Sequence, residues 1–192
     1  FKHKIIEIIE NATENEWTEI RAQVYSELNV AMQSKGQETA ILNIIKNVLQ
    51  ERGVSEFHHL LPGLLFLSKT NFSPLVNNIF VILMKGTDIP QFVSAICQQA
   101  QSSEQSLIAS IDLITRVYAT VKPKDCSPSF QVVFPLLKKE FINENAEIRK
   151  KVVMCLVEMK VADSETADKY INTLLKSQQK LVSVYYNRRV SQ

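Results

Sequence analysis

Three histidines are the first candidates for metal binding or acid–base chemistry in this sequence. His58 and His59 are adjacent, and adjacent side chains on an α-helix point about 100° apart, so we expect that they do not bind one metal ion together. Neither lies in an HExxH motif or beside a pair of cysteines, and His3 lies near the start of the chain. We therefore predict ordinary surface or boundary histidines, no metal site and no cofactor.

The three cysteines give no sign of nucleophilic or redox chemistry. They cannot form a closed set of disulfides and none lies in a CxxC motif, which is typical of a reducing compartment. Cys97 and Cys155 lie in apolar segments and are expected in the core, where burial raises the pKa of a thiol. Cys126 lies in a connecting segment, which is compatible with an exposed side chain. Nucleophile-elbow, P-loop and kinase motifs are missing from the sequence, so we predict neither an enzyme nor a small-molecule substrate.

Composition excludes further classes of function. The net charge of the 192 residues is +2, which is too small for strong electrostatic attraction to nucleic acid. No apolar run approaches the roughly 18 residues that a membrane-spanning helix needs. The sequence has no signal peptide and begins with Phe1 rather than Met, so we expect a fragment of a longer protein. Nucleic-acid partners and membrane insertion are therefore not expected.

The elements that must position any functional residue are predicted to be helices. Glycine and proline together make up only 10 of the 192 residues, too few for the many turns of a sandwich or barrel. Apolar residues recur at helical spacing along nearly the whole chain. The predicted helices span residues 2–11, 15–33, 37–52, 56–69, 73–85, 89–101, 103–121, 127–142, 145–160 and 164–187.

Internal similarity indicates a repeat. Residues 15–28 match residues 143–156 at seven of fourteen positions, an offset of 128. A second similarity, at an offset of 73, covers a helix with an internal proline, a turn and a second helix. Its aligned pairs are Phe57 with Phe130, Pro62 with Pro135, Leu64 with Leu137, Leu75 with Ile148, Ile79 with Val152 and Leu83 with Leu156.

The repeating unit is thus a helical hairpin of about 35–40 residues, the size of HEAT and armadillo repeats. One such hairpin cannot bury its inner face alone, and stacked neighbours form a continuous core. We predict an all-α solenoid of about five hairpins and ten helices, folded as a single domain over residues 1–192.

Charge is distributed unevenly along the chain. Residues 101–192 carry 14 basic and 10 acidic side chains, and Asp168 is the last acidic residue. The basic residues after it are Lys169, Lys176, Lys180, Arg188 and Arg189. This segment is either a solvated basic edge or a docking surface for an acidic partner. We expect the final helix to pack Val184 and one tyrosine onto the last repeat.

The turns between the two helices of each hairpin are a second candidate binding surface, because they align along one edge of a solenoid. Trp17 is expected at such a turn, with Arg21 one helical turn later. Trp17 is either an exposed partner of Arg21 in a binding hot spot or a core residue that anchors its own helix. At the matching later turn, Arg149 is expected to bond acidic or carbonyl groups of the neighbouring repeat, and Lys150 and Lys151 to be solvated or to face a partner.

Two of these segments, residues 147–157 and the closing residues 176–189, resemble the C-terminal domain of CLASP proteins. Residues 89–121 are similar to the penultimate repeat of that domain. The resemblance implies a TOG-like array of HEAT repeats that docks CLIP-type linkers and kinetochore motor or coiled-coil proteins. It also implies a cytoplasmic, cytoskeletal location at spindles, kinetochores, microtubule plus ends or the cortex. The partner-binding residues would be Lys150, Lys151, Lys180, Arg188 and Arg189.

A second resemblance offers an alternative. Residues 16–21 resemble the first intra-repeat turn of TOG domains that bind tubulin directly, where a tryptophan precedes basic residues. This resemblance implies tubulin binding by Trp17, Arg21 and Lys150. The chain departs from that pattern at Glu16 and Glu19, because acidic residues beside the tryptophan oppose an acidic tubulin surface.

Overall fold

The computed structural model describes residues 2–192, and every regular element within them is helical. The all-α prediction is confirmed. None of the described helices combines the length and the apolar character that crossing a membrane requires. The chain divides into two compact units, Phe1–Thr87 and Asp88–Gln192. The single domain expected over residues 1–192 stays a prediction.

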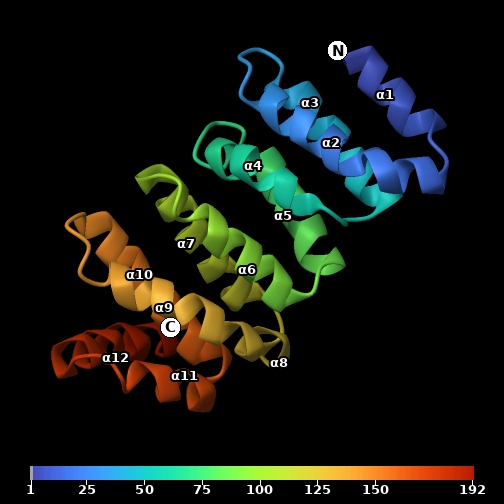
Figure 1. Ribbon diagram of the computed structural model, residues 1–192. Coiled ribbons are helices and arrows are strands. Elements are labelled where there is room, and N and C mark those ends of the chain that lie inside the picture. The colour runs from blue at the N-terminus through green and yellow to red at the C-terminus, as the bar shows by residue number, and fades with distance from the viewer. Residues whose placement is uncertain (1) are drawn as a thin grey trace. The chain divides into compact units, whose positions relative to one another are not determined.

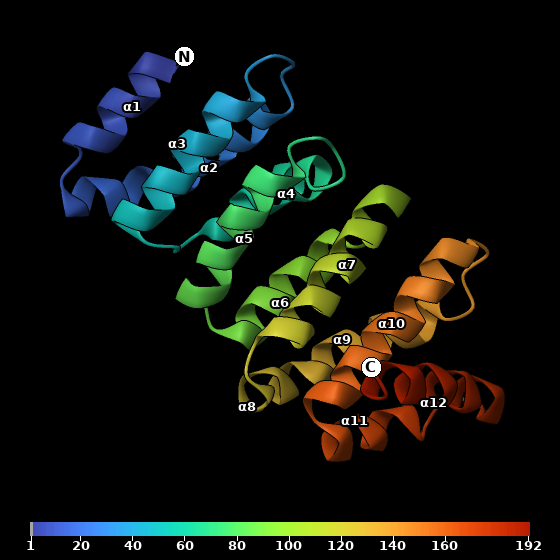
Figure 2. The ribbon, with the colours of Figure 1, turned by 180° about the vertical axis from the view of Figure 1, so that it is seen from behind.

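The first unit consists of two layers of helices. Its elements are α1 (Lys2–Asn11), α2 (Glu14–Met32), α3 (Glu38–Arg52), the 3-10 helix η1 (Phe57–His59), α4 (Leu61–Leu67) and α5 (Ser73–Gly86). Helix α2 packs against α4 in one layer, while α3 packs against α5 and α1 in the other. From behind, α3 and α5 lie side by side (Figure 2). In the stack of the hairpins α2–α3 and α4–α5, the first helix therefore packs on the first and the second on the second, as expected of HEAT-type repeats.

Polar groups fix the junction between α1 and α2. Thr13 and Glu16 form a capping box, in which the Thr13 Oγ1 accepts from the Glu16 amide at 3.3 Å and the Glu16 carboxylate accepts from the Thr13 amide at 2.8 Å. Arg52, at the end of α3, donates to the carbonyl groups of Ile9 and Ala12 at 2.7 and 3.0 Å. These bonds satisfy free carbonyl groups at the end of α1 and join it to α3.

The second unit continues the same architecture. Its elements are α6 (Ile89–Gln99), α7 (Glu104–Thr120), α8 (Pro123–Cys126), the 3-10 helix η2 (Ser127–Ser129), α9 (Phe130–Glu140), α10 (Ala146–Ala162), α11 (Ser164–Ile171) and α12 (Lys176–Val190). Helix α6 packs against α9, and α10 packs against both α7 and α12. Within this unit, the turns of the hairpins α6–α7, α9–α10 and α11–α12 share the left edge of Figure 1.

The repeat predicted at an offset of 73 is confirmed. It aligns η1 and α4 with α9, each the first helix of a hairpin, and α5 with α10, each the second. The repeat predicted at an offset of 128 is wrong, because it aligns α2, a first helix, with α10, a second helix. Both segments begin with similar polar caps and share helical periodicity, which is enough to produce the match without structural equivalence.

The helix predicted over residues 164–187 is two helices. It is interrupted at residues 172–175, between α11 and α12. This turn contains no glycine or proline, so the usual punctuation of a helix end is missing from the sequence.

Candidate protein-interaction site

The start of α12, the helix with three of the predicted partner-binding residues, is fixed by glutamine side chains. Gln179 donates from Nε2 to the carbonyl groups of Asn172 and Leu174 at 3.1 and 2.7 Å. Gln178 accepts from the Leu175 amide at 3.1 Å. These bonds satisfy backbone groups at the break between α11 and α12, so α12 begins in a defined register.

One face of α12 packs onto α10. Val182 is its buried residue. Arg189 donates from Nε to the carboxylate of the buried Glu158 on α10 at 2.8 Å. The Lys160 ammonium, also on α10, lies 4.9 Å from the centre of the Tyr186 ring, within the range of a cation–π interaction. This inner face fixes α12 in place.

The opposite face of α12 is exposed and combines apolar with basic side chains. Leu181 and Val184 are 41% and 39% exposed, although they are large apolar residues. Lys180 and Arg188 are exposed beside them, and the spacing of three and four residues places all four on one face of the helix. The Arg188 guanidinium lies 5.4 Å from the centre of the Tyr185 ring. We call Lys180, Leu181, Val184 and Arg188 the α12 outer face.

Two expectations about α12 need correction. Val184 was expected to pack onto the last repeat, but it is exposed, and Val182 occupies the buried position on the face of α12 that packs onto α10. Arg189 was expected to face a partner, yet its ion pair with Glu158 gives it a role within the fold. A buried carboxylate requires such compensation for its lost hydration. Lys180 and Arg188 keep the exposed positions expected of them.

The predicted residues at the start of α10 also separate into two groups. Lys150 is exposed. The Lys151 ammonium lies 2.8 and 3.0 Å from the two carboxylate oxygens of Asp112 on α7. The expectation that Lys151 is solvated or partner-facing is therefore corrected, because this half-buried lysine joins α10 to α7.

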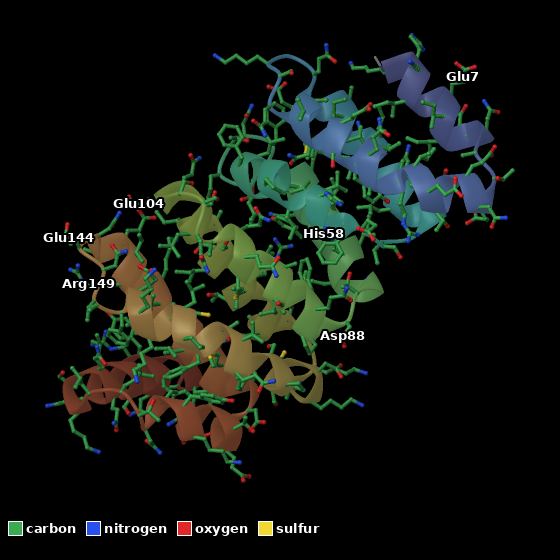
Figure 3. The ribbon with its side chains drawn as sticks, in the orientation of Figure 1. Glu7, His58, Asp88, Glu104, Glu144 and Arg149 are labelled. Carbon is green, nitrogen blue, oxygen red and sulfur yellow. The ribbon has the colours of Figure 1, made fainter. Side chains whose placement is uncertain are left out.

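Arg149 has a structural role, but not the expected one. It donates from Nη1 to the carbonyl groups of Asn143 and Glu144 at 2.6 and 2.8 Å. These groups belong to the turn before its own helix, not to the neighbouring repeat. Figure 3 shows Arg149 and Glu144 together at the start of α10.

The burial of Trp17 decides between its two interpretations. Its side chain is 1% exposed, and its ring packs edge-to-face against Tyr25 with 5.8 Å between ring centres. The Arg52 guanidinium lies 5.9 Å from the ring centre. Trp17 is a core residue, and it lies beside the link from α1 to α2 rather than at a turn within a hairpin. Arg21, its proposed partner, is half-buried.

Sequence reasoning missed two exposed apolar residues at turns of the second unit. Ile142, in the α9–α10 turn, is 77% exposed, and Leu175, in the α11–α12 turn, is 67% exposed. Ile142 had a detectable signal, because it lies between a helix end and the polar sequence Asn-Glu-Asn. Leu175 had none, because the predicted helix ran through it.

The cysteines are buried differently than expected. Cys126 is fully buried, although it lies in a connection, and Cys97 is the partly exposed one. Burial raises the pKa of Cys126 to about 11 and that of Cys97 and Cys155 to about 12. Thiols with such pKa values are poor nucleophiles at neutral pH.

The geometric reason for excluding a shared site at His58 and His59 is wrong. Both belong to the 3-10 helix η1 rather than to an α-helix, and their ring centres are 4.2 Å apart. The carboxylate of Glu56 faces both rings.

Comparison with known proteins finds similarity in sequence and in fold. No family model matches the sequence. Over 85 residues, or 44% of the chain, the sequence is 27% identical to a CLIP-associated protein of Arabidopsis thaliana, of whose length the match spans 6%. The fold matches the TOG domain of Zyg9 from C. elegans with a TM-score of 0.70 and 12% identity, covering 98% of this chain and 74% of that one. The chain has the fold of a TOG domain and resembles a CLIP-associated protein in part of its sequence.

The two comparisons give different information. The Zyg9 match shows the fold alone, a solenoid of HEAT-type hairpins. The similarity to CLASP proteins comes from the sequence match to the plant protein. Both agree with the resemblance expected from the closing residues.

Proposed function

We propose that this CLASP-like TOG domain is a non-enzymatic interaction module of a microtubule-associated protein, and that it recruits that protein to a partner through the α12 outer face. The observation that carries the proposal is the exposure of Leu181 and Val184 between Lys180 and Arg188. An exposed apolar pair on a helix already anchored by its other face is available to a partner.

The chemistry of this face favours an acidic amphipathic helix as the partner. Apolar residues of such a helix would cover Leu181 and Val184, and its carboxylates would pair with Lys180 and Arg188. The chain carries no acidic residue after Asp168, so nothing in α12 opposes an acidic partner.

The relative in Arabidopsis thaliana is named for association with a CLIP protein, so CLIP-type linkers are the first partners to test. Kinetochore motors and other coiled-coil proteins are the next candidates. A cytoplasmic, cytoskeletal location at microtubule plus ends, spindle or cortex follows from this proposal.

The proposal is tested by titrating the domain into a labelled fragment of a CLIP-type linker and measuring fluorescence anisotropy at low salt. Lys180→Glu combined with Arg188→Glu should weaken binding about tenfold or more, because like charges then face each other. Leu181→Ser should weaken it without changing its salt dependence. Lys122→Glu combined with Lys124→Glu, an equal charge change at exposed residues around α8, is the matched control. Equal loss in the control would refute docking at α12.

Direct tubulin binding, the alternative from the sequence, is tested in the same assay with soluble tubulin. Trp17→Ala cannot serve as its probe, because removing a buried tryptophan costs about 3–5 kcal/mol of folding free energy. Lys150→Glu changes an exposed residue and leaves the core intact. Tubulin binding that Lys150→Glu abolishes would favour the alternative.

A further inference from the structure

A group of metal-ligating side chains lies in the connection between α3 and α4. One ligand atom each from Glu56, His58 and His59 lies within 4.8 Å of the others. All three are partly exposed, so an ion could reach them from solvent. His58 is labelled in Figure 3. The group is separate from the α12 outer face, so it does not depend on the proposed function.

The distances within the group fit ligands of one ion better than hydrogen bonds. The Nε2 atoms of His58 and His59 lie 3.5 and 3.6 Å from the same carboxylate oxygen of Glu56. Hydrogen bonds between charged nitrogen and oxygen are shorter, about 2.7–2.9 Å. Ligands about 2.0–2.1 Å from a tetrahedral zinc ion are about 3.4 Å apart.

The hydrogen bond of His59 to Ser26 decides which of its nitrogens is available to an ion. Its Nδ1 lies 3.3 Å from the Ser26 Oγ, and that hydroxyl donates its hydrogen to the Ala22 carbonyl at 2.9 Å. The Ser26 Oγ can then only accept, so the His59 Nδ1 carries a hydrogen and Nε2 is the ring nitrogen that can bind an ion.

The backbone of Glu56 has an energetically unfavourable conformation in this position. Its φ is 61°, the left-handed conformation that residues other than glycine, asparagine and aspartate rarely adopt. The following 3-10 helix then brings both imidazoles to the carboxylate.

We propose that Glu56, His58 and His59 bind one Zn²⁺ ion, with water completing its coordination. Two imidazoles and one carboxylate suit zinc, whereas Mg²⁺ and Ca²⁺ prefer oxygen ligands throughout. The hydrogen bond from His59 to Ser26 supplies the outer contact that orients a histidine ligand. The ion would hold the α3–α4 connection in this conformation, and His59 already joins that connection to α2 through Ser26.

Isothermal titration of the full chain with Zn²⁺ tests the site. We expect one ion per chain, and Glu56→Asn, His58→Asn and His59→Asn should each weaken binding about tenfold or more. Glu56→Asn is the sharpest variant, because asparagine tolerates the left-handed backbone and so removes the carboxylate without adding strain. His3→Asn removes an exposed histidine elsewhere and should bind like the wild type.

A second readout measures stability. Zn²⁺ should raise the thermal unfolding midpoint of the wild type and of His3→Asn more than that of Glu56→Asn at the same concentration, because an ion that binds the folded state stabilises it in proportion to the logarithm of its affinity. The proposal is overturned if no single saturable site is found, which would leave only an ion pair of imidazolium and carboxylate. It is also overturned if Glu56→Asn and His58→Asn bind like the wild type.

Discussion

Arg188 and Arg189 are adjacent residues of the same type, yet they lie on different faces of α12. Arg189 pairs with the buried Glu158, whereas Arg188 is exposed next to Tyr185. A helix turns by about 100° per residue, so adjacent side chains meet different surroundings. At the residue scale, a basic side chain is therefore a candidate for partner binding only if the fold does not already use its charge.

This difference predicts unequal effects on stability. Arg189→Gln should lower the free energy of unfolding by about 1–2 kcal/mol, because it leaves the Glu158 carboxylate buried without its cation, although the partly exposed arginine limits the loss. Arg188→Gln should change it by no more than about 0.5 kcal/mol. Urea denaturation followed by circular dichroism measures both. Adding Glu158→Gln should recover part of the stability of Arg189→Gln, and equal losses in the two single variants would contradict the assignment.

At the scale of elements, capping side chains position the helices around the candidate site. Asp163 caps α11, and its carboxylate accepts from the Thr166 amide at 3.1 Å and from the Ser127 hydroxyl at 2.7 Å. It thereby joins the start of α11 to η2. Hydrogen bonds from the Thr166 side chain, Ser127 and the Thr166 amide lower the pKa of Asp163 from 3.8 to about 2.

A lowered pKa gives a defined pH dependence. The stability that Asp163 contributes is fully present above pH 3.8 and is lost as the pH falls through about 2, because protonation weakens its hydrogen bonds. Asp163→Ala should cost about 1 kcal/mol at pH 7, the usual effect of losing a helix cap. The difference in the free energy of unfolding between Asp163→Ala and the wild type should decrease as the pH falls from about 4 to about 2. Urea denaturation across this range measures it, with Asp125→Ala as a control that removes an exposed carboxylate. A difference that is constant with pH would contradict the role of the carboxylate.

At the scale of the whole molecule, hairpins stack through like helices within each unit. Such an array is stabilised by contacts between neighbouring repeats, so its cooperativity depends on how strongly the repeats are coupled. The chain has a single tryptophan, Trp17, which is buried in the first unit and reports on that unit alone.

This single tryptophan provides a test of the predicted single domain. If residues 1–192 unfold as one domain, the urea midpoint from Trp17 fluorescence should coincide with the midpoint from far-ultraviolet circular dichroism, which reports helices throughout the chain. Two separate midpoints would show that the units unfold independently and would refute the single-domain prediction.

The sequence by itself determined the fold class and much of the repeat. Scarce glycine and proline and a helical apolar period leave few alternatives to stacked helices, and the proline-containing helices at an offset of 73 identified equivalent hairpins. It also indicated that Lys180 and Arg188 lie on an exposed basic edge. These features depend on local propensity and periodicity, which neighbouring residues carry.

Only the tertiary structure decided which charged side chains form ion pairs within the fold and which side chains are buried. Lys151 and Arg189 are engaged by Asp112 and Glu158, partners 39 and 31 residues away in sequence, and no local pattern encodes such pairs. The burial of Trp17 depends on the layer to which α2 belongs. The meeting of His58 and His59 with Glu56 depends on a 3-10 turn and a left-handed residue, which helical periodicity does not anticipate. Burial and pairing arise from contacts between distant segments, and those contacts exist only once the hairpins have stacked.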